Sequence, residues 1–249
     1  MLFIILPIYN EEDGLPVLLQ DMLSEFSDTE LQIIAVNDGS TDKSLDILKS
    51  HLRATDIICS HATNMNVGVV FSEGIREFLT RSTEDDVLII MESDATSDIK
   101  LVRDLYATIE ENKIDVVIAS RYCTGGCYRR FPLFRLLLSY SANRFMKLMF
   151  PIVNVSDYSF FCRAYSWKIM NKMREQFGVH GIIQSSTFFS NVELLVKISF
   201  LSDQFIEIPA IYDYGKKKGA SKMRLFATLM EYFKMIRILR QIRKKIVQS

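Results

Sequence analysis

Residues 84–98 read EDDVLIIMESDATSD, and this stretch is the strongest indication of the fold. An apolar run at 87–91 is followed at once by Glu92 and Asp94. Where a buried strand ends, two carboxylates one residue apart can both turn toward a divalent cation, which then neutralises a substrate pyrophosphate. A second interpretation stays open, in which these residues form a solvated loop that caps the helix beginning at Asp98.

The same alternation of apolar runs and amphipathic segments extends outward from this stretch. Apolar runs bounded by turn residues predict strands at 2–6, 31–36, 56–59, 87–91 and 116–119. Segments with helical periodicity lie between them at 15–26, 44–52, 69–79 and 99–111. Strands without a polar face, each followed by an amphipathic helix, predict an α/β fold with a mostly parallel sheet covered on both sides.

Composition limits the possible partners and compartments. Lys plus Arg and Asp plus Glu each total 30, so net charge does not indicate a nucleic-acid or acidic partner, and no nucleic-acid partner is expected. Acidic residues are frequent over 1–115, whereas Lys and Arg cluster at 121–147 and 216–245, which indicates a bound metal in one half and a bound phosphate in the other. The four cysteines have no C-x-x-C spacing and no secretory signal precedes them, so reduced thiols in the cytoplasm are expected.

Polar clusters follow four of the predicted strands. In parallel α/β sheets, ligands bind at the carboxyl ends of the strands, so these clusters are expected on one edge of the sheet. They are Pro7-Ile8-Tyr9-Asn10-Glu11, Asn37-Asp38-Gly39-Ser40-Thr41-Asp42, Glu92-Ser93-Asp94 and Ser120-Arg121-Tyr122. The sequence therefore predicts a single site at this edge.

The order and spacing of these clusters resemble family 2 glycosyltransferases, especially the polyprenyl-phosphate (dolichol-phosphate) mannose synthase branch. The resemblance runs from residue 3 to about 224. It also includes Asn66-Val67-Gly68, Asp157, Glu193 and Gly219-Ala220-Ser221-Lys222. It implies a GT-A fold over 1–224, a nucleotide-diphosphate sugar donor such as a GDP- or UDP-hexose, a requirement for Mg²⁺ or Mn²⁺, and inversion at the anomeric carbon.

The resemblance implies a nucleotide-binding role for residues after the first two strands. Pro7, Tyr9 and Glu11 match base-contacting positions, and Asp38 matches the partner of the base or ribose. An aromatic face with fixed acceptors suits a planar ring that forms hydrogen bonds. Ser93 is placed in the same nucleotide-binding set. For Tyr9, simple packing is the alternative.

The resemblance places Glu92, Asp94 and Thr96 at the metal-binding motif, with Asp94 as the direct ligand. Two of them depart from the family pattern, because Glu replaces the usual first Asp and Thr replaces a frequent Gln. Glu is one methylene longer than Asp, so Glu92 can also reach the ribose or an outer-shell water. A hydroxyl is still a hard ligand, but an N-cap role for Thr96 is equally open.

Basic residues later in the chain are expected to bind phosphates. Arg121 and Arg135 match the acceptor-phosphate region of the family, and a guanidinium holds phosphate oxygens in two-point contact. Lys216, Ser221 and Lys222 form a basic loop of the kind that closes over a pyrophosphate. The alternatives are a solvated helix charge for Arg135 and a plain surface loop for 216–222.

Residues 156–165, SDYSFFCRAY, match a family segment that retains Asp157 and Arg163. Phe161 replaces a usual Gly, which is expected to narrow the acceptor side of the pocket. Asp157 is the candidate general base if the acceptor is a sugar hydroxyl, whereas a lipid phosphate needs no strong base. Glu193 matches a buried carboxylate of the family, and its alternative is an i,i+4 pair with Lys197.

The C-terminal residues 225–249 predict a basic amphipathic helix, which suits an anionic membrane surface. Residues 133–150 predict a second interfacial helix. Packing against the catalytic domain or a homodimer partner is the alternative. If the helix is an anchor, removal of 226–249 is expected to free the protein from vesicles and leave the fold intact.

Three hypotheses of function follow. The first is metal-dependent hexose transfer to a polyprenyl phosphate by an enzyme peripherally attached to the cytoplasmic membrane face. The second is transfer to a sugar hydroxyl of a cell-surface glycan. The third is a non-catalytic relative that binds nucleotide sugar, prompted by Glu92, Thr96 and Phe161.

Overall fold

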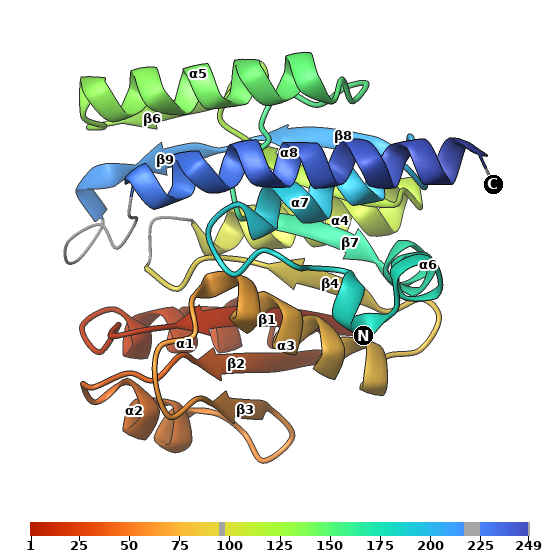
Figure 1. Ribbon diagram of the computed structural model, residues 1–249. Helices are drawn as coiled ribbons and strands as arrows, with labels where there is room; N and C mark the ends of the chain where they lie inside the picture. Colours follow the sequence, from red (N-terminus) through yellow and green to blue (C-terminus); the bar gives the residue numbers. More distant parts are fainter. Residues whose placement is uncertain (95–97, 217–224, 249) are drawn as a thin grey trace.

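The computed structural model describes residues 1–94, 98–216 and 225–248 of the chain; side chains are described up to Gly215, apart from 95–97, and then only at 232 and 234–246. A seven-stranded sheet with the order β3-β2-β1-β4-β7-β5-β8 forms the centre (Figure 1). Within this sheet only β7 runs antiparallel to its neighbours, in the part of the chain that the structure describes. The strands are β1 (Leu2–Ile8), β2 (Leu31–Asn37), β3 (Ile57–Ser60), β4 (Val87–Ile90), β5 (Val116–Ser120), β7 (Arg163–Ser166) and β8 (Phe205–Pro209).

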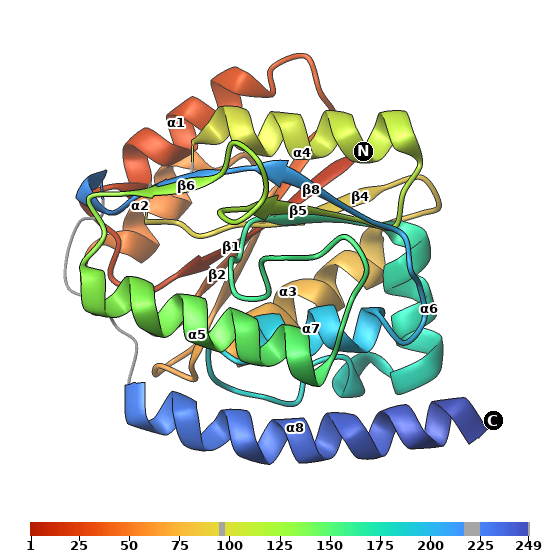
Figure 2. The same ribbon diagram turned by 90° about the horizontal axis from the view of Figure 1, so that it is seen from above.

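Helices cover both faces of the sheet (Figure 2). One face carries α1 (Leu15–Glu25), α2 (Ser44–His51) and α4 (Ile99–Asn112). The other carries α3 (Val67–Arg81), α6 (Trp167–Phe177) and α7 (Ser190–Ile198), with α8 (Leu225–Gln248) outside them. Alternate residues of β1 serve the two layers, because Phe3 packs into the α3 side and Ile4 into the α1 side. Both faces of this strand are therefore buried, which explains its unbroken apolar sequence.

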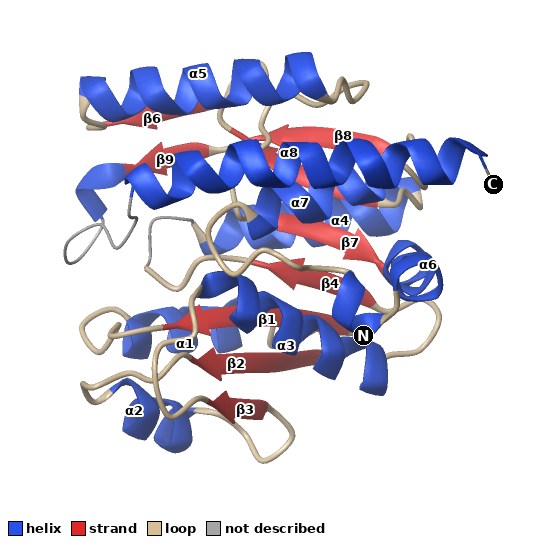
Figure 3. Ribbon diagram, in the orientation of Figure 1, coloured by secondary structure: helices blue, strands red, loops and turns tan. Residues whose placement is uncertain are grey.

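A small second sheet lies beyond the β8 edge. It pairs β6 (Cys127–Arg129) with β9 (Ile211–Asp213) in parallel, and α5 (Leu133–Met149) lies over it (Figures 1 and 3). The hydroxyls of Tyr128 and Ser139 are 2.8 Å apart and link β6 to α5. Two short 3-10 helices, η1 (Val179–Gly181) and η2 (Tyr214–Lys216), complete the described elements.

The predicted α/β fold with a mostly parallel sheet is confirmed. All five predicted strands and the four helices predicted between them are present, with ends that differ by at most two residues. The largest difference is at the helix predicted for 69–79, because α3 spans Val67–Arg81 and so extends two residues further at each end. Asp98 is the N-cap of α4 and accepts a hydrogen bond from the Lys100 amide at 3.1 Å, so the capping interpretation of this residue is correct.

The C-terminal helix packs against the domain with its apolar side. Met235, Ile236 and Leu239 of α8 are buried in the same core as α3 and α7. The Tyr232 ring meets the Phe189 ring edge-on at a centroid distance of 4.7 Å. The structure thus has the alternative arrangement, in which this helix packs on the catalytic domain. Removal of residues 226–249 would expose part of this core, and the expectation that the fold stays intact without them remains a prediction.

Candidate active site

The ends of three adjacent parallel strands meet at one edge of the sheet. β1 is hydrogen-bonded to β2 on one side and to β4 on the other. Beyond the ladder, the Asp38 amide donates to the Ile8 carbonyl at 2.8 Å. The Ser93 hydroxyl donates to the Pro7 carbonyl at 2.6 Å. These bonds bring the residues that follow the three strands together at this edge, as the sequence predicts.

The loop after β1 is fixed by the loop after β2. The Asn10 amide donates to the Ser40 hydroxyl at 3.0 Å, and the Thr41 amide donates to the Asn10 side-chain carbonyl at 2.8 Å. The Glu11 amide donates to the Ser44 hydroxyl at 2.9 Å. These bonds hold the backbone directly after Tyr9, whose side chain is partly exposed. Tyr9 and Glu11 are thus placed beside the loop that carries Asp38.

Asp38 is almost fully buried, with an exposed fraction of 3%. Its Oδ1 atom accepts a hydrogen bond from the Met65 amide at 2.7 Å and lies 2.7 Å from His61 Nδ1. Gly39 follows it with a φ of +67°, and a Cβ at this position would lie 2.4 Å from the Thr63 carbonyl carbon. The turn after β2 therefore requires glycine, and it presses against the loop after β3.

Sequence reasoning did not select His61. The residue follows the apolar strand β3 directly, as Asp38 follows the β2 strand end, so its position after a strand was the available signal. Its contact with Asp38 was not visible in the sequence, because 23 residues separate the two.

Glu92 and Asp94 follow β4, and Asp94 is buried with an exposed fraction of 8%. Within residues 1–94, 98–216 and 225–248, no three His, Cys, Asp or Glu side chains group closely enough to hold a metal ion. Thr96 is outside the described residues. Two carboxylates nevertheless fit Mg²⁺ or Mn²⁺, because such ions are held by one or two carboxylates while substrate phosphates and water complete the coordination.

Arg121 follows β5 and forms a buried ion pair with Asp157. The guanidinium Nε donates to Asp157 Oδ2 and Nη2 donates to Oδ1, each at 2.7 Å. Nη2 also donates to the Ser159 hydroxyl at 2.8 Å. The Asp157 carboxylate further accepts from the Ser159 and Phe160 amides, both at 3.1 Å. Two residues predicted for the site are thus brought together, as partners of each other.

Charge and burial act in opposition on this pair. Burial raises the pKa of Asp157, but the charge and hydrogen bonds of Arg121 outweigh burial, so this pKa lies below its ordinary value. Burial lowers the pKa of Arg121, and Asp157 reverses the effect, so the guanidinium pKa is raised. Aromatic rings line the same space, with Phe160 and Tyr128 centroids 4.7 and 4.9 Å from the Arg121 guanidinium carbon.

Two other residues of the segment 156–165, Arg163 and Phe161, make contacts within the protein core. Arg163 is fully buried and donates to the Asn191 and Tyr158 carbonyls at 2.9 and 2.8 Å. The Phe161 ring packs against Phe71 at a centroid distance of 5.3 Å, within the core on the α3 side.

Glu193 pairs with Lys197, as the alternative interpretation of its sequence position predicts. Both side chains are buried. The Glu193 carboxylate also accepts from the Gln184 and Ser185 amides at 3.0 and 2.8 Å, so it holds the loop before α7.

The remaining predicted phosphate contacts are only partly described. The Arg135 guanidinium carbon lies 5.7 Å from the centroid of the Tyr214 ring, and Tyr214 begins the 3-10 helix that ends at Lys216. Arg135 is therefore adjacent to the start of the predicted basic loop. The Lys216 side chain, Ser221 and Lys222 are outside the described part of the chain.

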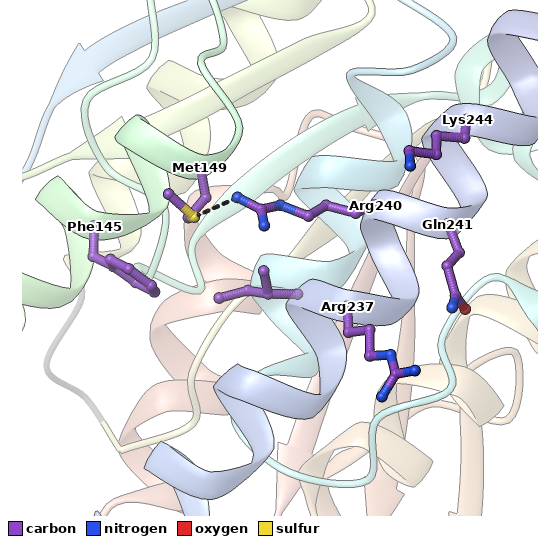
Figure 4. Close-up of a pocket in the computed structure, with 7 residues that line it drawn as sticks. Phe145, Met149, Arg237, Arg240, Gln241 and Lys244 are labelled. Carbon is purple, nitrogen blue, oxygen red and sulfur yellow. Dashed lines mark hydrogen bonds between the residues drawn. The ribbon is translucent and has the colours of Figure 1, made fainter.

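A groove lies between α5 and α8, on the half of both helices away from the carboxyl ends of β1 and β2 (Figures 1 and 4). Its volume is about 450 Å³. Arg240 reaches across it and donates to the Met149 sulfur at 3.0 Å. The lining combines apolar and cationic side chains, namely Phe145, Met149, Ile236, Arg237, Arg240, Gln241 and Lys244.

The sheet order and the polar edge define an α/β nucleotide-diphospho-sugar transferase fold of the GT-A type. Glucosyl-3-phosphoglycerate synthase from Mycobacterium tuberculosis, solved with Mn²⁺, UDP-glucose and phosphoglyceric acid, is similar with a TM-score of 0.60 and 15% identity. That match covers 99% of this chain and 79% of the other. S. aureus TarS gives a TM-score of 0.55 at 18% identity, over 85% of this chain and 60% of the other. At these identities the likeness establishes the fold.

The chain belongs to glycosyltransferase family 2, because the model of this family, Glycosyl transferase family 2, matches residues 3–174. Polyprenol monophosphomannose synthase from Mycolicibacterium smegmatis is 25% identical over 224 residues, which cover 88% of this chain and 80% of that protein. Dolichol-phosphate mannosyltransferase from Pyrococcus furiosus is 23% identical over 241 residues, which cover 94% and 62%.

A third relative is undecaprenyl-phosphate 4-deoxy-4-formamido-L-arabinose transferase from Shewanella sediminis, 25% identical over 179 residues that cover 69% of this chain and 50% of that protein. The chain thus spans half to four-fifths of the length of these curated relatives. It is a glycosyltransferase related to the polyprenyl-phosphate sugar transferases, and the hypothesis of a non-catalytic protein is set aside.

Proposed function

We propose that this enzyme transfers a hexose from a GDP- or UDP-linked donor to a polyprenyl phosphate, with inversion and with Mg²⁺ or Mn²⁺. The observation that carries the proposal is the meeting of Tyr9, Asp38 and Asp94 at the ends of three hydrogen-bonded parallel strands. An aromatic ring, a buried acceptor and a pair of carboxylates there supply what a base, a ribose and a cation-bound diphosphate require.

On the donor side, the chain binds and orients. Asp38 offers a fixed carboxylate to the nucleoside, with Pro7 near the end of β1 and with Tyr9 and Glu11 on the loop after β1. Glu92 and Asp94 would hold the metal, with Ser93 fixing their backbone through its bond to Pro7. When bound, Mg²⁺ or Mn²⁺ supplies positive charge that stabilises the departing diphosphate. We assign the same role to Lys216 and Lys222 from the sequence.

On the acceptor side, the contacts of Arg121 favour a phosphate acceptor over a sugar hydroxyl. Its Nε and Nη2 atoms are bound to Asp157 and Ser159, and among the described residues no side chain or carbonyl accepts from Nη1. In the proposal, Nη1 contacts the acceptor phosphate, with Arg135 and Ser221 as further contacts. A lipid phosphate is already anionic near neutral pH, so positioning is the main requirement.

A hydroxyl acceptor would need a general base, and Asp157 is the candidate. Its side chain is fully buried, and both of its oxygens accept hydrogen bonds. This geometry does not favour proton abstraction from a bulky glycan. The three curated relatives, each named for a polyprenyl- or dolichol-phosphate substrate or product, support the same choice of acceptor.

The proposal includes attachment to the cytoplasmic face of a membrane. Large apolar side chains of α5 are exposed, with Leu133, Leu137 and Leu148 at 71, 59 and 75%. The cations of α8 are also exposed, namely Lys234, Arg237, Arg240, Arg243, Lys244 and Lys245. An apolar helix face beside a basic row suits an anionic lipid surface. None of the described helices is long and apolar enough to cross a bilayer.

The test is a transfer assay with labelled GDP-hexose or UDP-hexose, Mn²⁺ and a polyprenyl phosphate. Label that becomes extractable into organic solvent and is released by mild acid is the expected product. Asp94→Asn is expected to lower the rate about 100-fold or more, because a ligand of the charge-stabilising ion is lost. Asp104→Asn, on the exposed part of α4, is the matched control. Transfer only to a water-soluble glycan would contradict the proposed acceptor.

A further inference from the structure

His61 bridges two acidic side chains from different elements. Its Nδ1 atom lies 2.7 Å from Asp38 Oδ1, at the end of β2. Its Nε2 atom lies 2.5 Å from Glu73 Oε2, on α3. The His61 amide donates to the Asn37 carbonyl at 2.9 Å, so the backbone is also tied to β2. The ring therefore links the end of β2, the loop after β3 and the first half of α3.

The two contacts determine the protonation state of the ring. An ionised carboxylate can only accept hydrogen bonds, so two contacts with carboxylates require a proton on both ring nitrogens. His61 is then an imidazolium. Burial lowers its pKa, but the hydrogen bonds and charges of Asp38 and Glu73 outweigh burial, and the pKa of His61 lies above its ordinary value.

Few other titratable groups surround this ring. Arg76 on α3 pairs with Glu73 at 3.1 Å from the exposed side. Cys59 on β3 is a neutral thiol, because burial, with Glu73 and Glu77, raises its pKa to about 11. From β2 the facing charged group is Asp38, and from α3 it is Glu73. Protonation of His61 therefore leaves the three-residue cluster with one net negative charge, and deprotonation leaves it with two.

We infer that His61 is a positioning residue for donor binding, which clamps Asp38 at the end of β2 and ties it to α3 through Glu73. This inference rests on the proposed function, in which Asp38 contacts the nucleoside. Both described contacts of the Asp38 side chain use Oδ1. Oδ2 is thus the atom of Asp38 that these contacts leave for the nucleotide.

The clamp makes donor affinity dependent on pH. At a pH below the raised pKa of His61, the protonated ring donates hydrogen bonds to both Asp38 and Glu73. As the pH rises through that pKa, one ring nitrogen becomes an acceptor and repels the carboxylate beside it. The cluster also gains one negative charge where the nucleoside of the anionic donor is proposed to bind. Donor affinity should therefore fall as the pH rises.

The experiment measures the dissociation constants of UDP and GDP, each with Mg²⁺, by calorimetry between about pH 6 and pH 9. For the wild-type protein we expect the affinity to weaken about tenfold across this range, the scale of one charge-assisted hydrogen bond. His61→Asn should bind weakly throughout and lose the pH step. Glu73→Gln should keep tight binding at low pH and move the step to lower pH, because one carboxylate no longer holds the proton.

His51→Asn is the matched control, since His51 is an exposed histidine on α2 whose Nδ1 contacts the Ile47 carbonyl at 3.0 Å. It should bind like the wild type at every pH. Should His61→Asn fail to fold, the pH step of Glu73→Gln and an NMR titration of the His61 ring in the wild type decide the matter. An ordinary ring pKa, or nucleotide affinity that is independent of pH and unchanged in His61→Asn, would overturn the inference and leave the proposed function standing. Failure of both nucleotides to bind the wild type would overturn both.

Discussion

At the scale of single residues, Arg121 and Asp157 show how a charged group is kept in an aromatic environment. Neither charge is stable alone among Phe160, Tyr128 and the surrounding core, because an isolated buried ion loses its hydration. The two-point pair and the amide donors to Asp157 replace that hydration. The same ion pair fixes the orientation of the Arg121 guanidinium, and with it the direction in which Nη1 points.

Replacement of Asp157 by Asn should destabilise the protein by about 3–5 kcal/mol at neutral pH, because the Arg121 charge is then buried without its partner. Urea unfolding measures this difference. The pKa of Asp157 is lowered in the folded state, so the pair stabilises the fold above the ordinary carboxyl pKa. The difference between wild type and Asp157→Asn should therefore shrink as the pH falls through the folded-state pKa. A constant difference down to that pH would contradict the ion-pair explanation.

The sequence predicts which residues lie at the sheet edge that carries the candidate active site. It predicts less well which other residues each of them contacts. Tyr9, Asp38 and Asp94 could be found because each follows an apolar run, and a parallel sheet collects such positions. The pairing of Arg121 with Asp157, and of Asp38 with His61, joins residues 36 and 23 positions apart. Such pairs depend on how loops return to the sheet, and no periodicity in the sequence records that path.

At the scale of secondary-structure elements, long apolar runs were predicted and short late strands were not. β1, β2, β4 and β5 are buried on both faces, so their sequences stand out. β7 has only the four residues Arg163–Ser166, two of which are polar, and it was not predicted. β8 mixes Glu207 with apolar residues because it lies at the sheet edge, with β5 on one side. Edge strands carry a weaker pattern.

The start of α3 depends on a glycine that allows close contact with the loop before α7. The Gly68 amide donates to the Ser186 carbonyl at 2.9 Å, and a Cβ on Gly68 would lie 1.9 Å from the Ser185 carbonyl oxygen. Gly68→Ala should therefore destabilise the protein by about 1–3 kcal/mol, measured by thermal or urea unfolding. Gly14→Ala is the control, because nothing lies within 4 Å of its added Cβ. Equal stability of the two variants would contradict the contact.

The basic side of α8 is a better target than its deletion for testing membrane attachment. Reversal of two exposed charges, Arg237→Glu with Arg240→Glu, should strongly reduce sedimentation with anionic vesicles and leave the buried contacts of Met235 and Leu239 in place. The control is an equal charge change on other helices, Lys49→Glu with Lys100→Glu. Unchanged sedimentation of the α8 variant, or equal loss in the control, would argue against a lipid-facing α8.

At the scale of the whole molecule, metal, donor and stability should be linked. A ligand present at about 100 times its dissociation constant stabilises the folded state by about 2.7 kcal/mol. For a chain of this size, that corresponds to a rise in Tm of roughly 5–10 °C. UDP or GDP with Mn²⁺ should produce this rise in a thermal-shift assay, and EDTA should remove it. A rise that persists in EDTA would contradict a cation shared between carboxylates and diphosphate.

The antiparallel strand β7 divides the active edge into two parts. The residues proposed to bind the donor follow β1, β2 and β4, all before residue 95, whereas Arg121, α5 and the second sheet lie on the other side of β7. Only β7 joins β4 to β5 in the described sheet. We therefore expect mutations on the β5 side of β7 to change the acceptor that the enzyme uses and to leave nucleotide binding, proposed for the β4 side, unchanged.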